Sequence, residues 1–297
     1  MKSQKASLLA IMSLLALSCC QSGTSLEKLD YQINEEFGNI QGTFAVAFKD
    51  LSTGTVLFIN EHESFHAAST MKTPVLIEVY KQTSEGRFAL TDSIEIKNTF
   101  KSIVDGSLYS LTANDDSEKE LYNITGKKHT ISDLVYEMII VSSNLATNII
   151  IELVGADNVT QTMRDLGAPD IQVIRGVEDI KAFELGLSNT TTAYDLMIIF
   201  ERMAKGETVN EEASEAMINI LLDQKFNTII PAKLPDDVRV AHKTGAITGV
   251  HHDSGIIFLP DGRTYVLVLL SKEVADTDAG TSAQANVSRY LYEFMTQ

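Results

Sequence analysis

The chain has 297 residues, with 24 Lys or Arg against 40 Asp or Glu, so its formal net charge is −16. Because no basic cluster follows the N-terminal residues, neither a nucleic-acid partner nor peripheral binding to anionic lipid is expected. Both cysteines lie near the N-terminus. The remaining part, about 275 residues, must therefore be stabilised by its core without a disulfide.

The N-terminal residues have the pattern of an export signal. Two lysines precede an apolar run over 8–17, which is too short to span a bilayer. The run ends at Cys19 and Cys20, and a cysteine directly after such a run is typical of a lipidation site. We predict a lipoprotein-type signal peptide over 1–20, and either cysteine could carry the lipid. An ordinary secretory peptide is the alternative. The expected protein is an exported monomer, periplasmic or held at the membrane only by this lipid.

Hydrophobic periodicity then predicts the elements in chain order. We expect a helix over 26–37, strands over 42–51 and 55–60, and a second helix over 69–85. A long loop with short helical pieces is expected over 94–128. Five further helices are expected over 134–141, 145–154, 158–166, 193–204 and 211–224. We expect three strands over 238–247, 254–259 and 264–271, and a closing helix over 280–296.

Strands at both ends of the chain, with helices between them, indicate a mixed architecture. We predict an α/β (α+β) fold in which both chain ends form an antiparallel five-stranded sheet flanked by helices. A central all-helical subdomain would pack beside this sheet. Both parts belong to one domain over 26–297, with the α/β part at about 26–66 and 227–297 and the helical part at about 67–226.

A serine and a lysine stand three residues apart where the predicted helix 69–85 begins. Residues at i and i+3 share a helix face, so the amine of Lys72 can approach the hydroxyl of Ser69. A serine hydroxyl needs an adjacent base to act as a nucleophile at neutral pH. Lysine can help only if its pKa falls, which burial and a second cation such as Lys243 would favour. On its own, such a pair is more typical of an ordinary surface helix.

Two further motifs follow downstream. Ser142 and Asn144 lie just before a predicted helix, and Lys243, Thr244 and Gly245 lie in a predicted strand. In this order, the elements Ser-x-x-Lys, Ser-x-Asn and Lys-Thr-Gly resemble those of the class A serine β-lactamases, within the penicillin-binding-protein superfamily. The resemblance covers nearly the whole chain after the signal peptide. It implies the fold predicted above, with a site in the cleft between its two parts.

The resemblance also implies an acyl-transfer site. Ser69 would be the nucleophile, and Lys72 would help to remove its proton, directly or through water. The backbone N–H groups of Ser69 and Ala246 would form the oxyanion hole. Ser142 would relay a proton to the leaving nitrogen, and Asn144 would bind the substrate's side-chain amide and Lys72.

Three residues of the strand would bind the substrate. Lys243 and Thr244 would recognise its carboxylate by charge and by hydroxyl, and Gly245 would let it approach the strand edge. The arginine that the family often adds nearby has no clear match, and His251 and His252 follow instead. Neighbouring strand residues point to opposite faces, so these histidines are not expected to share a metal. No metal or other cofactor is predicted.

A loop that resembles the Ω-loop of class A enzymes begins near Arg175. In that family a glutamate holds the water that hydrolyses the acyl-enzyme, and Glu178 is the best match. Asp179 is a rival, and a Glu178 that merely caps the loop or pairs with Arg175 is the structural alternative. The asparagine expected four residues after the glutamate is Ala182 here, so the placement of a water is open.

The most favoured prediction is therefore a serine β-lactamase that uses Ser69, Lys72 and Glu178 to hydrolyse a small-molecule β-lactam. A D,D-peptidase or related serine hydrolase with slow deacylation, acting on a cell-wall peptide, is the alternative. A non-catalytic penicillin-binding or sensor protein is the third hypothesis.

Overall fold

The computed structural model describes residues 25–297. The predicted signal peptide over 1–20 and the lipidation of Cys19 or Cys20 lie outside the described residues, so both stay predictions, as do export and the membrane anchor. Within 25–297, none of the helices combines the length and the apolar character that a membrane span requires.

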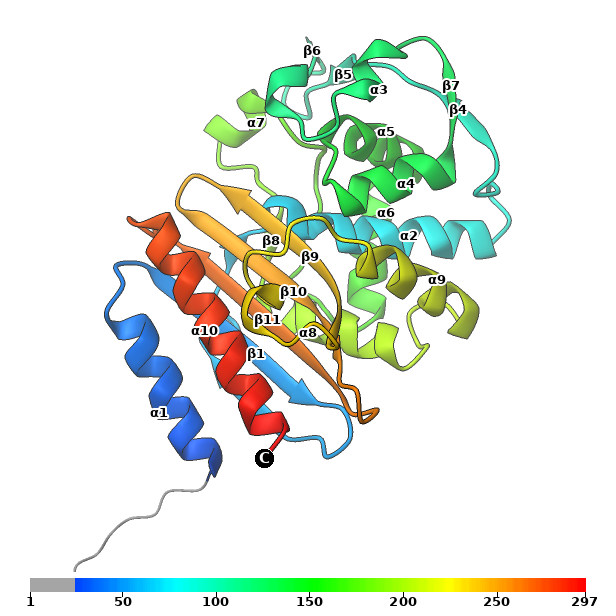
Figure 1. The fold of residues 1–297 in the computed structure, drawn as a ribbon. Helices are drawn as coiled ribbons and strands as arrows, with labels where there is room; N and C mark the ends of the chain where they lie inside the picture. The colour runs from blue at the N-terminus through cyan, green and yellow to red at the C-terminus, as the bar shows by residue number, and fades with distance from the viewer. Residues whose placement is uncertain (1–24) are drawn as a thin grey trace, which may run out of the picture.

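The centre of the fold is a five-stranded antiparallel sheet, as predicted, in the order β2-β1-β11-β10-β9 (Figure 1). Its strands, in chain order from β1 and β2 to β9, β10 and β11, span Thr43–Asp50, Val56–Ile59, Arg239–Ile247, Val250–Phe258 and Thr264–Lys272. The first strand of the chain pairs with the last, so that residues 43–50 face residues 265–272. The sheet therefore unites both ends of the chain, and β9 is its edge strand.

The alternation of side chains along β1 divides the core into two layers. Phe44, Val46 and Phe48 pack in the cluster formed with α1 (Ser25–Gly38) and α10 (Thr277–Met295). Ala45 and Ala47 pack in the larger cluster with the remaining helices. A strand that is buried on both faces needs apolar residues at successive positions, and six of the eight residues of β1 are buried.

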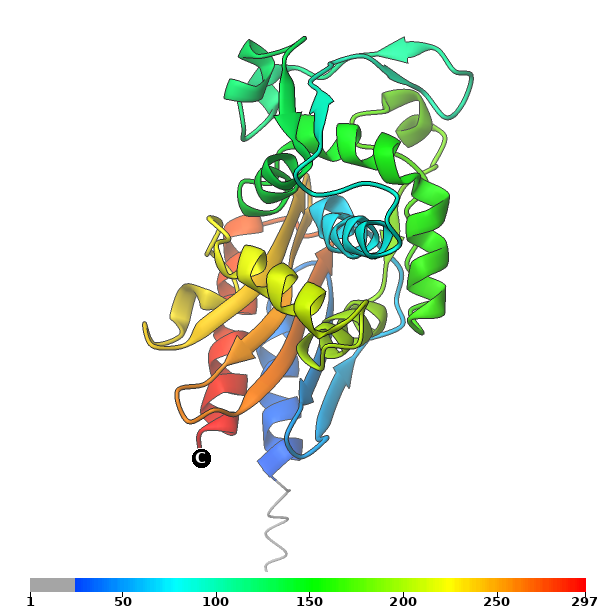
Figure 2. The ribbon, with the colours of Figure 1, turned by 90° about the vertical axis from the view of Figure 1, so that its right-hand side faces the viewer.

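The middle of the chain forms the predicted helical part, most of which lies beyond one end of the sheet in the ribbon views, while its last two helices lie beside the sheet (Figures 1 and 2). Its helices α2, α3, α4, α5, α6, α7, α8 and α9 span Lys72–Ser84, Glu120–Asn123, Ile131–Ile140, Asn144–Val154, Ala156–Asp165, Ile180–Glu184, Ala193–Ala204 and Glu211–Leu222. Helix α8 packs on β1, β10 and β11, and so joins the helical part to the sheet.

The predicted helix 69–85 is divided in the structure. A 3-10 turn, η1 (Ala68–Met71), precedes α2, and the N–H of Lys72 donates to the carbonyl of Ser69, three residues before it. Pro74 has no N–H to donate to the carbonyl of Thr70, four residues before it, so regular α-helical bonding cannot begin one turn earlier, at Ser69. The division places Ser69 in the 3-10 turn and Lys72 at the start of the α-helix.

Several short elements were not predicted. Within the expected loop 94–128 and its flanks, the structure has two pairs of strands, β4 with β7 and β5 with β6, over Ser93–Glu95, Lys128–Thr130, Phe100–Lys101 and Leu108–Tyr109. The 3-10 turn η2 (Ala113–Asp115) and helix α3 match the short helical pieces that were expected in this loop. Strands β3 (Phe65–His66) and β8 (Thr190–Thr191), the 3-10 turn η3 (Pro231–Lys233) and helix α7 were also missed. Elements of two to five residues are too short to show a hydrophobic period.

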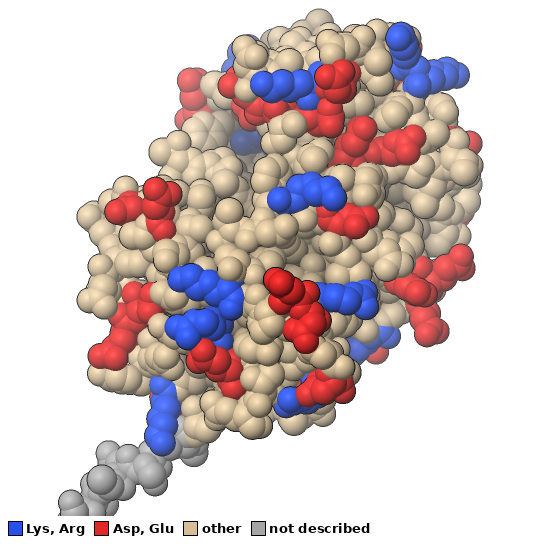
Figure 3. Space-filling model, in the orientation of Figure 1, with Lys and Arg blue, Asp and Glu red and all other residues tan. Residues whose placement is uncertain are grey.

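The charged side chains on the face shown in Figure 3 are interspersed, and Lys and Arg gather in no large patch there. That face therefore presents no extended basic surface.

Candidate active site

Ser69 lies at the meeting point of two adjacent cavities. One, of about 320 Å³, extends along the loop 175–180, and the other, of about 330 Å³, extends toward 226–229. Both are lined by Ser69, Asn144 and Ala246. A half-buried hydroxyl at such a junction is open to a ligand from two sides.

The backbone around Ser69 is held in an uncommon conformation. Ala68 has a φ of +44°, in the left-handed region that non-glycine residues seldom adopt. Its N–H donates to His66 Nδ1 at 3.0 Å, which helps to hold this conformation. Strain of this kind persists only where surrounding contacts fix the chain. Here it turns Ser69 toward strand β9.

A glycine is needed at position 245 because strand β9 packs closely against the 3-10 turn that carries Ser69. A Cβ atom at Gly245 would lie 3.0 Å from the backbone nitrogen of Ser69 and 3.1 Å from that of Thr70. The expected reason for this glycine was the approach of substrate to the strand. In the structure, the atoms that need the space belong to the 3-10 turn itself, because β9 and η1 are in contact.

The amine of Lys72 is fully buried and directed at the second motif. It donates to the carbonyl oxygen of Ser142 at 2.7 Å, to Ser142 Oγ at 3.0 Å and to Asn144 Oδ1 at 3.0 Å. Burial lowers the pKa of Lys72 to about 7, although the nearby carboxylates of Asp116 and Glu178 oppose this shift. A large fraction of this amine is therefore neutral near pH 7, as a proton acceptor requires, and this neutral form donates only two of the three hydrogen bonds.

Lys243 brings a second amine to the same hydroxyl. Its Nζ donates to Ser142 Oγ at 3.0 Å and to the carbonyl of Thr244 at 3.0 Å. Burial lowers the pKa of Lys243 well below its usual value, and the charge of Lys72 lowers it further. Ser142 itself has a φ of +58°, so a second strained residue lies at the site.

The outer edge of β9 borders the cavity. Thr244, Gly245 and Ala246 line the cavity of about 330 Å³ together with Ser69. Because β9 has a neighbouring strand on one side only, alternate backbone N–H groups along its other edge have no strand partner. An N–H of this edge and that of Ser69 are candidate donors for an oxyanion.

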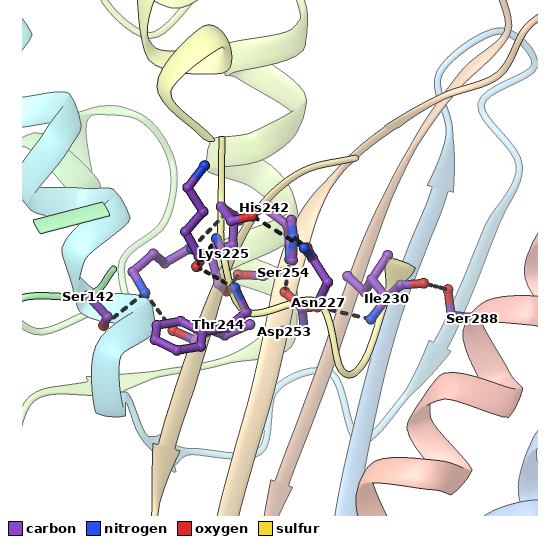
Figure 4. A network of polar contacts seen from close by, with 12 residues as sticks. Ser142, Lys225, Asn227, Ile230, His242, Thr244, Asp253, Ser254 and Ser288 are labelled. Carbon is purple, nitrogen blue, oxygen red and sulfur yellow. Dashed lines mark hydrogen bonds and ion pairs between the residues drawn. The ribbon is translucent and has the colours of Figure 1, made fainter. Parts of the chain in front are cut away.

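A buried polar network supports β9 from behind (Figure 4). His242 Nδ1 lies 2.8 Å from Asp253 Oδ1, and His242 Nε2 lies 3.0 Å from Asn227 Oδ1. The other oxygen of Asp253 accepts the N–H of Ile230 at 3.0 Å. The network joins β9 and β10 to the segment 226–229 that lines the cavity, so it fixes the strand position of Lys243.

Glu178 also faces the cavities around Ser69. It lines the cavity of about 320 Å³ and has a φ of +61°, the third strained backbone at the site. No hydrogen bond joins its carboxylate to another residue within 25–297. The guanidinium of Arg175 instead donates to the carbonyls of Leu187 and Gly176, so the expected alternative of an Arg175–Glu178 pair is not what the structure contains.

The neighbouring carboxylate has a structural place. Asp179 is buried, caps helix α7, and accepts hydrogen bonds from Ser102 Oγ, from the N–H of Ile103 and from the N–H of Ala182. Ala182 is buried and is not among the residues lining the cavities at Ser69. Of the two rival carboxylates, Glu178 is therefore the one available to a ligand or water.

Two buried residues that position the site were not identified from the sequence. Asn148 accepts the N–H of Val177 at 2.6 Å and donates to the carbonyl of Val177 at 3.0 Å, directly before Glu178. Its spacing of four residues from Asn144 put both on one face of α5, a signal that could have identified it. Asp116 accepts the N–H groups of Asn144 and Leu145, and no local pattern marked it.

The two adjacent histidines point away from each other, as expected. His252 is buried, and its Nδ1 accepts the N–H of Ser271, so Nε2 carries the proton given to the carbonyl of His66 at 2.9 Å. Burial lowers the pKa of His252 to about 4. His251 bonds Thr281 of α10 through Nδ1 at 2.7 Å. Within residues 25–297, no group of three or more His, Cys, Asp or Glu is arranged to hold a metal ion.

This arrangement can be compared with known proteins. Residues 28–295 match the sequence profile of the family Beta-lactamase2, the beta-lactamase enzyme family. Beta-lactamase VEB-1 of Pseudomonas aeruginosa is 24% identical over 288 residues, covering 93% of this chain and 92% of VEB-1. A crystal structure of a beta-lactamase from Sphaerobacter thermophilus superposes with a TM-score of 0.76 and 27% identity, over 91% of this chain and 98% of that one. The structure of PBP-A superposes with a TM-score of 0.78 and 26% identity, over 91% and 96%. Because the profile spans nearly all of the described residues, this chain belongs to the beta-lactamase enzyme family.

Proposed function

We propose that this protein is a serine β-lactamase that opens the β-lactam amide through an acyl-enzyme on Ser69. The observation that carries the proposal is that Lys72 and Lys243 both donate to the hydroxyl of Ser142, which lines the same cavity as Ser69. Membership of the beta-lactamase enzyme family supports it. The substrate is a small-molecule β-lactam, and no step requires a cofactor.

In the acylation step, the Ser69 Oγ attacks the lactam carbonyl carbon. Lys72, with its lowered pKa, takes the proton of that hydroxyl, directly or through a water. The negative charge on the carbonyl oxygen is stabilised by the N–H groups of Ser69 and Ala246. When the C–N bond breaks, Ser142 passes a proton to the nitrogen, because its hydroxyl lies between the amines of Lys72 and Lys243.

Binding depends on the residues beside this centre. Lys243 and Thr244 hold the carboxylate of the substrate by charge and by hydrogen bond. Asn144 Oδ1 is engaged by Lys72, which leaves its amide N–H₂ for the side chain of the substrate. In the deacylation step, Glu178 takes a proton from a water that attacks the ester carbonyl, and Ser69 regains its own.

One observation favours a second candidate, a D,D-peptidase or related serine hydrolase with slow deacylation. Ala182, which cannot hold a water by a side-chain hydrogen bond, is turned away from the cavities. PBP-A, similar to this chain, has a mutant whose structure was solved as an acyl-enzyme complex with penicillin G. A non-catalytic penicillin-binding or sensor protein would share the acylation step but not the release.

Intact-mass spectrometry after mixing with benzylpenicillin, followed over time and combined with nitrocefin turnover, separates these functions. A lactamase gives a transient adduct and continuous turnover, whereas a peptidase or a sensor keeps the adduct for minutes to hours. Ser69→Ala should remove both signals, and Ser84→Ala, at the exposed end of α2, should leave both unchanged. Absence of any adduct and of turnover with penicillins, cephalosporins and carbapenems would refute the proposal.

A further inference from the structure

The buried carboxylate of Asp116 contacts the segment that carries Ser142 and Asn144, although Asp116 lies far from it in the sequence. Asp116 lies between η2 and α3, and only 5% of it is exposed. Its oxygens accept the N–H groups of Asn144 at 3.0 Å and Leu145 at 2.8 Å. They also accept the hydroxyl of Tyr122 at 2.9 Å and the N–H of Glu118 at 3.1 Å. A side chain so fully bonded is fixed in place.

These contacts cap the N-terminus of α5, because they give its first N–H groups hydrogen-bond acceptors. The first N–H groups of a helix have no partner within it and attract negative charge. Asp116 binds the N–H groups of Asn144 and Leu145, while Ser143 Oγ accepts that of Ala146 at 3.2 Å. The turn 142–144 is therefore held from both sides, which explains how it keeps a strained residue at its first position.

The same turn carries all three acceptors of the Lys72 amine. These are the carbonyl and hydroxyl oxygens of Ser142 and the side-chain oxygen of Asn144. A shift of the turn would move the three together. The charged groups that act on the amine are Asp116 and Glu178, which favour its protonated form, and Lys243, which faces it across Ser142.

We propose that Asp116 is a positioning residue for acylation, which holds the turn 142–144 against Lys72 and places a negative charge beside the buried amine. The inference rests on the proposed function, in which Lys72 removes the proton of Ser69. Asp116 itself is not among the residues that line the two cavities at Ser69, although Asn144, whose N–H it accepts, lines both. It acts through the residues that it holds.

The test measures the acylation rate as a function of pH in Asp116→Asn and Asp116→Ala. We expect the rate at pH 7 to fall at least about tenfold, because the acceptors of Lys72 move. We also expect the midpoint of the acidic limb to move to lower pH. Loss of a nearby negative charge lowers the pKa of an amine, so it stays neutral in more acidic solution. A merely structural role would lower the rate and leave the midpoint in place.

Chemical rescue sharpens the test. A cavity of about 230 Å³, lined by Asp116, Tyr122, Asn144 and Glu178, adjoins the carboxylate, so formate can enter the space that Asp116→Ala creates. Added formate should restore both rate and midpoint in this variant, and chloride at equal ionic strength should not. Glu120→Gln is the matched control, because it removes one charge from an exposed position of the same segment.

The outcomes distinguish the two proposals. A wild type that is not acylated by benzylpenicillin or nitrocefin contradicts the proposed function. A wild type that is acylated, with folded Asp116 variants at wild-type rate and midpoint, overturns the inference about Asp116 alone. If neither variant folds, Tyr122→Phe decides, since it removes one hydrogen bond from the carboxylate and keeps the charge. It should slow acylation by about two- to fivefold, and a wild-type rate in this variant would overturn the inference.

Discussion

Lys72 and Lys243 both donate to one atom, the hydroxyl oxygen of Ser142, each at 3.0 Å. Two ammonium groups so close in a buried place repel each other, and burial disfavours the charge of either one. The arrangement therefore favours a state in which one amine is neutral. In the free protein the charge of Lys72 lowers the pKa of Lys243. In the proposed function a substrate carboxylate stabilises the charge of Lys243, so Lys72 is then the amine expected to give up its proton.

The acylation rate should depend on pH through Lys72. Its neutral form accepts a proton and its charged form does not, so with a pKa of about 7 the rate should rise with pH. We expect it to level off above about pH 8 and to fall about tenfold per unit below about pH 6. Stopped-flow acylation by nitrocefin measures this profile. Lys72→Ala should slow the step by about 100- to 10,000-fold. Lys81→Ala is the control and should not slow it, because Lys81 lies on the same helix as Lys72 but donates to Thr162 of α6. A flat profile in the wild type would contradict the assignment.

Asn148→Ala should affect deacylation more than acylation. The variant loses both hydrogen bonds to Val177, so Glu178 is no longer held beside the cavity, while Ser69 and Lys72 keep their own contacts. We expect deacylation to slow by about 10- to 100-fold and the benzylpenicillin adduct to persist in intact-mass spectra. Asn158→Ala, whose amide caps only the end of α5, is the control. Unchanged adduct lifetimes in Asn148→Ala would contradict the proposed role of Glu178 in deacylation.

Gly245→Ala should destabilise the protein and impair acylation together. The added methyl group would lie 3.0 Å from the Ser69 nitrogen, so β9 and η1 must move apart. We expect a loss of about 1 to 3 kcal/mol in the free energy of unfolding, read by denaturant titration, with slower acylation. Gly38→Ala, where a Cβ meets nothing within 4 Å, is the matched control. Equal stability of the two variants would show that the packing at Gly245 is not tight.

Asp253→Ala should destabilise the fold by removing the centre of the network behind β9. The change leaves the buried ring of His242 and the N–H of Ile230 without their partner. We expect a loss of about 3 kcal/mol in the free energy of unfolding. Asp261→Ala, at an exposed turn paired with Arg263, should cost far less. A comparable small loss in both variants would contradict a structural role for the pair of His242 and Asp253.

The general architecture could be predicted because its signals are long. Four of the five sheet strands and most of the central helices have eight or more residues, and the sheet assembled from both chain ends is confirmed. The short strands within 94–128 and helix α7 gave no comparable signal. The break before α2 could have been expected, because Pro74 removes one hydrogen-bond donor.

The candidate site could be predicted in part. Ser69, Lys72, Ser142 and Lys243 belong to motifs whose order is informative, and the structure brings them together. Asp116 could not be found, because it acts through backbone N–H groups of residues far along the chain, and such a contact leaves no local pattern. The three left-handed residues at the site could not be found either, since none is a glycine.

The pairing of β1 with β11 has a consequence for biosynthesis. Strand β1 must wait for β11, which follows it only after the whole helical part. Strand β9, which carries Lys243, is joined to β1 in the sheet only through β10 and β11. A nascent polypeptide that stops before residue 264 holds two hairpins, β1 with β2 and β9 with β10, that share no strand pairing. Pairing across so long a separation is slow, so β9 should reach its final position beside Ser69 only after residues 264–272 have been made.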